Sequence, residues 1–188
     1  MFARDLAKHM KTRELEQAYI CSIFHSLGRL LCQYYFPEES EDIRRVMTQH
    51  DYREDVAAQR VLGVSFEDLG IGLARSWGFP QVILESMRKL PAGAVRRPAT
   101  QEDRLRALSA VANEYCDAVA HLAPAERDKA MKAIAGRFAD AVPVELKAVR
   151  ELMQAAVQEI ENFAQIIKIN LRQTRIGRNL QASTARRP

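Results

Sequence analysis

Apolar residues recur at every third or fourth position along nearly the whole chain. No stretch shows the strict alternation of apolar and polar residues that a half-buried strand requires. Glycine and proline interrupt the spacing at short intervals, and no internal repeat is evident. The pattern therefore predicts an all-α fold built from many helices, with no sheet in its core.

The interruptions divide the chain into expected helices. Segments with helical spacing are 2–10, 14–35, 38–50, 53–62, 66–77, 81–90, about 100–122, 125–141 and 144–172. Ser65 and Thr100 each precede an acidic residue by three positions, the pattern of an N-terminal capping box. Pro124 and Pro143 suit the first turns of the last two helices. The Pro- and Gly-containing stretch 91–100 is expected to be a linker.

Two of these helices have unusually extensive apolar faces. The segment 14–35 is expected to be one central, buried helix because its apolar residues cover a wide face. They are Ala18, Cys21, Ile23, Phe24, Leu27, Leu30 and Leu31. The segment 144–172 carries a long seam of Leu146, Val149, Met153, Ala156, Ile160, Phe163, Ile167 and Leu171. Such a seam packs either within its own domain or against a second copy in a homodimer, and its spacing leaves both open.

The cysteines and the lack of long apolar runs limit which cellular location and which kinds of binding site can be expected. Three cysteines without a CxxC pair exclude a disulfide framework and a zinc knuckle, and they favour a reducing cytoplasm. No uncharged apolar run reaches the roughly 18 residues of a membrane span, and the first residues lack a secretory apolar core. No phosphate-binding glycine loop is present, so no cofactor is predicted. Gly70, Gly72 and Gly78 are expected to allow close helix packing instead.

The net charge of +4 is concentrated at one end of the chain. Residues 1–92 carry 12 basic and 13 acidic side chains, whereas six basic residues and no acidic one follow from position 168. Candidate partner contacts there are Lys168, Arg172, Arg175 and Arg178. An acidic partner or nucleic acid is one interpretation and a solvated helix end is the other. Nucleic acid is not favoured because no aromatic residues are interleaved for base stacking.

Two segments resemble a known bacterial signalling family. Residues 18–31 (AYICSIFHSLGRLL) and 61–87 (VLGVSFEDLGIGLARSWGFPQVILESM) are similar to helices of the HDOD family, the HD-related output domain. The resemblance implies an HD-domain-like helical bundle in 1–92. Helical apolar spacing predicts that this bundle is continued by a helical extension in 93–180, and the lack of such spacing predicts a disordered basic tail in 181–188. The family's N-terminal half has no counterpart here. Either the chain is part of a longer protein or that half has been lost.

The resemblance also indicates whether HD-type chemistry is expected. HD phosphohydrolases hold divalent metal ions with histidines and aspartates, and these ions generate hydroxide and bind phosphate oxygens. Here the His-Asp pair is replaced by His25-Ser26, and a later metal-binding position is Phe66. We therefore expect no metal and no catalysis, with His25 hydrogen-bonded to a neighbour and Phe66 filling the cavity. A phosphohydrolase with rearranged ligands is the alternative.

The single tryptophan has two interpretations. Trp77 is either a ring of the core at a helix end or an anchor for a partner. The family implies a regulatory protein that binds protein partners, in a two-component or second-messenger setting, and no membrane is expected as a partner.

Overall fold

The computed structural model describes residues 1–166 and 168, and within them every regular element is a helix. The helices are α1 (Phe2–His9), α2 (Leu15–Phe24), α3 (Leu27–Tyr35), α4 (Pro37–His50), α5 (Glu54–Leu62), α6 (Phe66–Ser76), α7 (Gln81–Ser86), α8 (Gln101–His121), α9 (Pro124–Arg137) and α10 (Leu146–Ile166). The all-α prediction is confirmed. None of these helices is both long and apolar enough to cross a bilayer.

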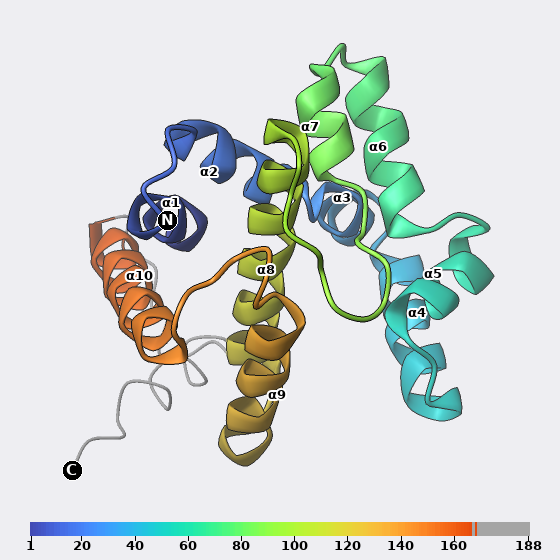
Figure 1. Ribbon diagram of the computed structural model, residues 1–188. Helices are drawn as coiled ribbons and strands as arrows, with labels where there is room; N and C mark the ends of the chain where they lie inside the picture. The colour runs from blue at the N-terminus through green and yellow to red at the C-terminus, as the bar shows by residue number, and fades with distance from the viewer. Residues whose placement is uncertain (167, 169–188) are drawn as a thin grey trace.

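Helix α8 organises the largest core cluster. It runs through the middle of the molecule, with α1 and α10 on one side and α4 and α5 on the other (Figure 1). The cluster unites α1, α2, α8, α9 and α10, and its fully buried large side chains include Leu6, Leu108, Phe138 and Val157. Helices from both sides of position 92 thus bury their apolar faces together.

Two smaller clusters stabilise the remaining helices. Cys32, Ile43 and Ala57 form one cluster, which joins α3, α4 and α5 and is covered by partly buried residues of α6. The other joins α6 and α7 around Ile71 and Leu84. The cavity described below lies where α2, α3, α5, α6 and α8 come together.

Local capping follows the sequence closely. The Ser65 side chain accepts a hydrogen bond from the Asp68 backbone N–H, and Thr100 does the same for Asp103. Each cap satisfies an otherwise unpaired donor at the start of its helix. Pro37 and Pro124 occupy the first helical turns of α4 and α9, where a missing N–H costs nothing. The loop at 91–99 matches the expected linker.

Several helix boundaries differ from the prediction. Helix α7 ends at Ser86 and α9 at Arg137, both earlier than the spacing indicated. After α7, side chains of α8 and α9 bind the carbonyl oxygens of the chain instead. Helix α10 begins at Leu146, after an irregular turn at Pro143. Position 167 and residues 169–172 of the predicted last helix lie outside the described residues.

The prediction of one buried helix over 14–35 is wrong in two respects. The helix is broken at His25 and Ser26, where long-range polar contacts replace continued helical geometry. Ile23 is 45% exposed and Leu30 is 52% exposed. Hydrophobic spacing reports that a face is apolar but not whether another element covers it. Ala18 and Cys21 are buried as expected.

The glycine prediction holds at one of its three positions. A Cβ on Gly70 would lie 2.8 Å from the backbone nitrogen of Gly28, so α3 and α6 approach closely there. A Cβ on Gly72 or Gly78 would meet nothing within 4 Å. Gly78 instead has a φ of 75°, which explains the glycine where α6 ends.

Candidate functional site

The break between α2 and α3 places two polar side chains at a cavity. His25 Nδ1 lies 2.9 Å from the Ser86 carbonyl oxygen at the end of α7. A carbonyl only accepts hydrogen bonds, so Nδ1 carries the proton and Nε2 keeps its lone pair. Ser26 Oγ donates to Asn113 Oδ1 at 3.1 Å. The break therefore exchanges helical hydrogen bonding for contacts to α7 and α8.

Asn113 connects α2 and α8. Its Nδ2 donates to the carbonyl oxygens of Ser22 at 3.0 Å and Ser109 at 2.8 Å, while its Oδ1 accepts from Ser26. Both donors and the acceptor of this half-buried amide are thus used within the protein. The hydroxyl of Ser26 is therefore held by this amide.

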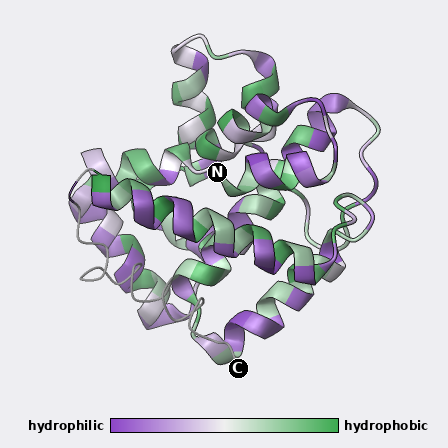
Figure 2. Cartoon of the chain, turned by 90° about the vertical axis from the view of Figure 1, so that its left-hand side faces the viewer, coloured by the Kyte–Doolittle hydropathy of each residue, from purple (hydrophilic) through white to green (hydrophobic). Residues whose placement is uncertain are grey.

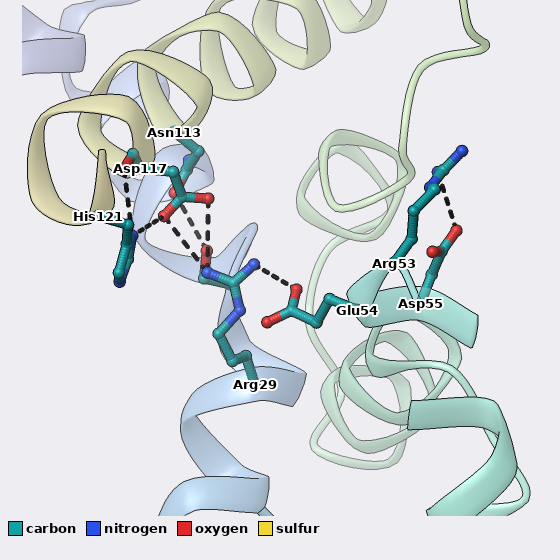
Figure 3. Close-up of polar contacts among 8 residues, drawn as sticks. Arg29, Arg53, Glu54, Asp55, Asn113, Asp117 and His121 are labelled. Carbon is teal, nitrogen blue, oxygen red and sulfur yellow. Dashed lines mark hydrogen bonds and ion pairs between the residues drawn. The ribbon is translucent and has the colours of Figure 1, made fainter. Parts of the chain in front are cut away.

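The cavity has a volume of about 540 Å³ and balanced charges. Its lining includes four basic residues (Arg29, Arg53, Lys89 and Arg137) and four acidic residues (Glu54, Glu67, Glu114 and Asp117). Figure 3 shows Arg29 of α3 between two of these carboxylates, with Glu54 of α5 at 2.6 Å and Asp117 of α8 at 3.4 Å. This ion-pair bridge joins three helices across the cavity.

Two arginines bind the chain that follows α7. Arg137 donates to the carbonyl oxygens of Pro91 at 2.9 Å and Gly93 at 3.1 Å, and it pairs with Glu114. Arg106 donates to the carbonyl oxygens of Arg88 at 2.9 Å and of Lys89. His25 binds the Ser86 carbonyl, which the end of α7 leaves unpaired, and the two arginines bind carbonyls of the loop that follows. The expectation that His25 binds a neighbouring group is supported by this contact.

Phe66 lies at the start of α6 and is partly buried. It lines the cavity and also packs on the cluster around Cys32 and Ile43, so its ring occupies only part of the space that it was expected to fill. Its carbonyl oxygen would lie 1.9 Å from a Cβ on Gly28.

Burial determines the protonation of His25. It lowers the pKa of the imidazole below 6.5, the Lys89 ammonium lowers the pKa further, and the hydrogen bond to Ser86 partly opposes the shift. The side chain is therefore neutral at pH 7, and Nε2 is a potential acceptor or ligand at the cavity. Within residues 1–166 and 168, no three His, Cys, Asp or Glu side chains are grouped as a metal site would require.

Trp77 and Lys168 are not among the residues that line this cavity. Trp77 is 53% exposed and its ring centroid lies 5.9 Å from that of Phe79, so the interpretation as a core ring is wrong. Lys168 follows the end of α10. Arg172, Arg175 and Arg178, and the predicted tail 181–188, lie outside the described residues.

Sequence reasoning did not single out the residues that bridge the cavity. Asn113, Asp117 and Glu54 are ordinary surface-type residues of helices, and nothing in their spacing joins them. One signal was available for Arg29, the only charged residue between Glu16 and Glu38. A lone cation in so apolar a stretch is expected to have a partner, since an unpaired buried charge is costly.

Residues 1–90, which form the all-helical region around the break between α2 and α3, match the family model of the HDOD domain. This match agrees with the resemblance seen in the sequence, and it begins before Ala18. No curated protein and no solved structure matches the chain.

Proposed function

We propose that the chain is a non-catalytic regulatory module that acts by binding protein partners in a bacterial cytoplasmic signalling pathway of the two-component or second-messenger type. The proposal rests mainly on Ser26 and Phe66, the two positions at which the resemblance would place metal ligands of an HD phosphohydrolase. Ser26 is hydrogen-bonded to Asn113, and Phe66 packs against the protein interior. The carboxylates at the cavity are engaged too, since Glu54 and Asp117 pair with Arg29, and Glu114 pairs with Arg137.

Exposed aromatic residues support the interaction part of the proposal. Around α3 they are Tyr34 at 79%, Tyr35 at 65% and Phe36 at 45% exposure. Trp77 adds a half-exposed indole at the end of α6. Tyrosine and tryptophan are the side chains on which protein interfaces most often depend, because each buries a large area with little loss of rotamer freedom.

A second candidate function rests on His25 alone. Its Nδ1 is oriented by a backbone carbonyl and its Nε2 is left for the cavity, an arrangement also found in metal-binding histidines. A phosphohydrolase with a rearranged ligand set would use that nitrogen. The charge-balanced lining does not favour this function, because a metal-bound phosphate requires carboxylates that are free to bind the metal.

One assay separates the two functions. The purified chain is incubated with Mn²⁺, Mg²⁺ or Zn²⁺ and with bis(p-nitrophenyl) phosphate or cyclic diguanylate, and its bound metal is measured by mass spectrometry. We expect no product above the buffer rate and far less than one metal ion per chain. Turnover that disappears in His25→Ala but persists in His121→Ala would overturn the proposal.

The proposed binding of protein partners is tested by a separate measurement. Trp77 is the only tryptophan, so intrinsic tryptophan fluorescence reports on this residue alone. In the free chain we expect emission typical of a solvated indole and strong quenching by iodide. When candidate upstream signalling domains are titrated in, the binding partner should shift the emission to shorter wavelength and protect it from iodide. Tight partner binding that Trp77→Phe and Tyr34→Ser leave unchanged would rule out this surface.

A further inference from the structure

A second depression lies along α8 and shares Asn113 with the lining of the first cavity. It is a groove of about 370 Å³ between α1, α2, α8 and α10. Its walls include Phe2 of α1, Ile23 of α2, Val119 of α8 and Val157 of α10. Figure 2 views the molecule from the side on which α10 lies in Figure 1, and hydrophobic residues interrupt the polar ones along its helices.

No described side chain in the groove lining carries a formal charge, although the lining includes Met1 with its amino group. Ser22 donates to the Tyr19 carbonyl oxygen at 2.8 Å, and the Asn113 amide donates to two carbonyls. Surrounding protein raises the pKa of the Cys116 thiol to about 11, so this group stays neutral. The side chains of the lining are thus mostly apolar, and they suit an apolar occupant.

Helix α10 carries apolar side chains beyond those that it buries. Val149, Met153 and Ala156 face the core, as the predicted seam requires. The seam then emerges at one end of the groove, where Ile160 is 37% and Phe163 is 53% exposed. Ile166 continues it at 77% exposure. We call Ile160, Phe163 and Ile166 the α10 stripe.

The opposite wall of the groove is also exposed and apolar. On α2, Tyr19 is 37%, Ile20 is 39% and Ile23 is 45% exposed. Together with the α10 stripe these are six exposed large apolar side chains, of which Tyr19, Ile23 and Ile160 line the groove and the other three lie on the same two helices. Soluble monomers rarely expose contiguous apolar patches of more than a few hundred Å², and larger ones mark interfaces.

We propose that a second copy of this chain occupies the groove, in a two-fold dimer in which the α10 stripe of each protomer packs into the groove of the other. A two-fold interface uses the same patch on both subunits, so stripe and groove must lie on one face. They do, because Ile160 belongs to both. A partner of another sequence would have to supply the apolar ridge that this chain already carries.

The size of the lining also suits a self-association. Glu159 and Glu161 flank Ile160, and Glu159 lies 3.6 Å from Arg4 of α1, so one of these two carboxylates is paired within its own protomer. Fifteen residues line the groove, and Ile20, Phe163 and Ile166 extend it. This set approaches the roughly 20 residues per partner of a standard interface.

Light scattering after size-exclusion chromatography tests the proposal on the full chain. From low micromolar to near-millimolar loading, we expect the mass to rise from 21.3 kDa toward twice that value. Phe163→Glu and Ile23→Glu should each hold the mass at the monomer value over the whole range. Leu30→Glu, at an exposed apolar position of α3 outside the groove lining, should dimerise like the wild type.

Circular dichroism and thermal unfolding of each variant show that the fold is retained, since both substituted positions are already exposed. A wild-type chain that stays monomeric at every concentration would overturn the proposal. So would a dimer that Phe163→Glu and Ile23→Glu leave intact, because it would use another surface. Neither result depends on whether the chain is catalytic, so this proposal and the proposed function can fail separately.

Discussion

At the scale of single residues, His25 should make stability depend on pH. Its pKa is lowered in the folded chain, mainly by burial, so the unfolded chain binds the proton more strongly. Stability is then complete above the unfolded pKa of about 6.5 and falls as the pH drops toward the folded pKa. His25→Asn keeps a donor for the Ser86 carbonyl but does not titrate. The variant should lose less stability than the wild type between about pH 7.5 and pH 5.

Urea unfolding at both pH values measures the loss of stability in the wild type and in His25→Asn. The carboxylates that also titrate are the same in both proteins, so they do not contribute to the difference. His121→Asn is the control. It removes an imidazole that is 62% exposed in place of the buried one. Equal pH dependence in His25→Asn and the wild type would mean that His25 stays solvated.

The second residue-scale prediction concerns the close approach of α3 and α6. A Cβ on Gly28 would lie 1.9 Å from the Phe66 carbonyl oxygen and 2.9 Å from the Gly70 nitrogen. Both are backbone atoms that cannot rotate away, so Gly28→Ala should destabilise the chain by about 3 kcal/mol or more. Gly72→Ala is the matched control within α6. Its Cβ meets nothing within 4 Å, and the change should stabilise the helix by about 1 kcal/mol.

Thermal or urea unfolding of the two variants tests this prediction, because the free energy of unfolding should fall in Gly28→Ala and rise in Gly72→Ala. If Gly28→Ala were neutral, the two helices would be farther apart than described. A neutral Gly72→Ala would leave that conclusion unchanged, because the gain expected there comes from helix propensity alone.

At the scale of helices, the bridge through Arg29 should hold α5 in place. Helix α5 packs on α4 and α6, and Arg29 links it to α8 through Glu54 and Asp117. Arg29 is 30% exposed, so solvent weakens the pair, and Arg29→Met should cost only about 1 kcal/mol overall. The local effect should be larger. Amide hydrogen exchange in α5 should accelerate more than in α8.

A comparison variant separates this bridge from surface charge in general. Arg45 pairs with Asp42 within α4 and is 59% exposed, so Arg45→Met should change stability by less than about 0.5 kcal/mol. Its exchange pattern should match the wild type. Uniform acceleration over all helices in Arg29→Met would argue that the bridge does not act locally on α5.

The ends of the helices show which features could be predicted from the sequence and which could not. The caps at Ser65 and Thr100 depend on residues three positions away, and both were predicted. The break at Ser26 depends on Asn113, 87 positions later, and no local pattern carries that information. The candidate site was predicted in part for the same reason. His25 and Phe66 came from a family resemblance, whereas Arg29, Asn113 and Asp117 meet only once the chain folds.

At the scale of the whole molecule, the extension at 93–180 should be required for the HDOD region to fold. Phe2, Leu6 and Cys21 are buried by contact with a cluster that α8, α9 and α10 complete. Burying a large apolar side chain contributes roughly 1.5–3 kcal/mol. Losing this burial at three positions is comparable to the 5–15 kcal/mol by which a whole domain is usually stable, as an order of magnitude.

The polypeptide 1–92 alone should therefore lack a cooperative unfolding transition. By circular dichroism we expect reduced helicity and a shallow thermal change, with strong binding of an apolar dye. The matched control is 1–168, which keeps every described residue and should unfold cooperatively like the full chain. The two results together would show that α8 to α10 are a structural part of the HDOD region here. A sharp transition in 1–92 would instead place a folding boundary at the linker and make the later helices an attached unit.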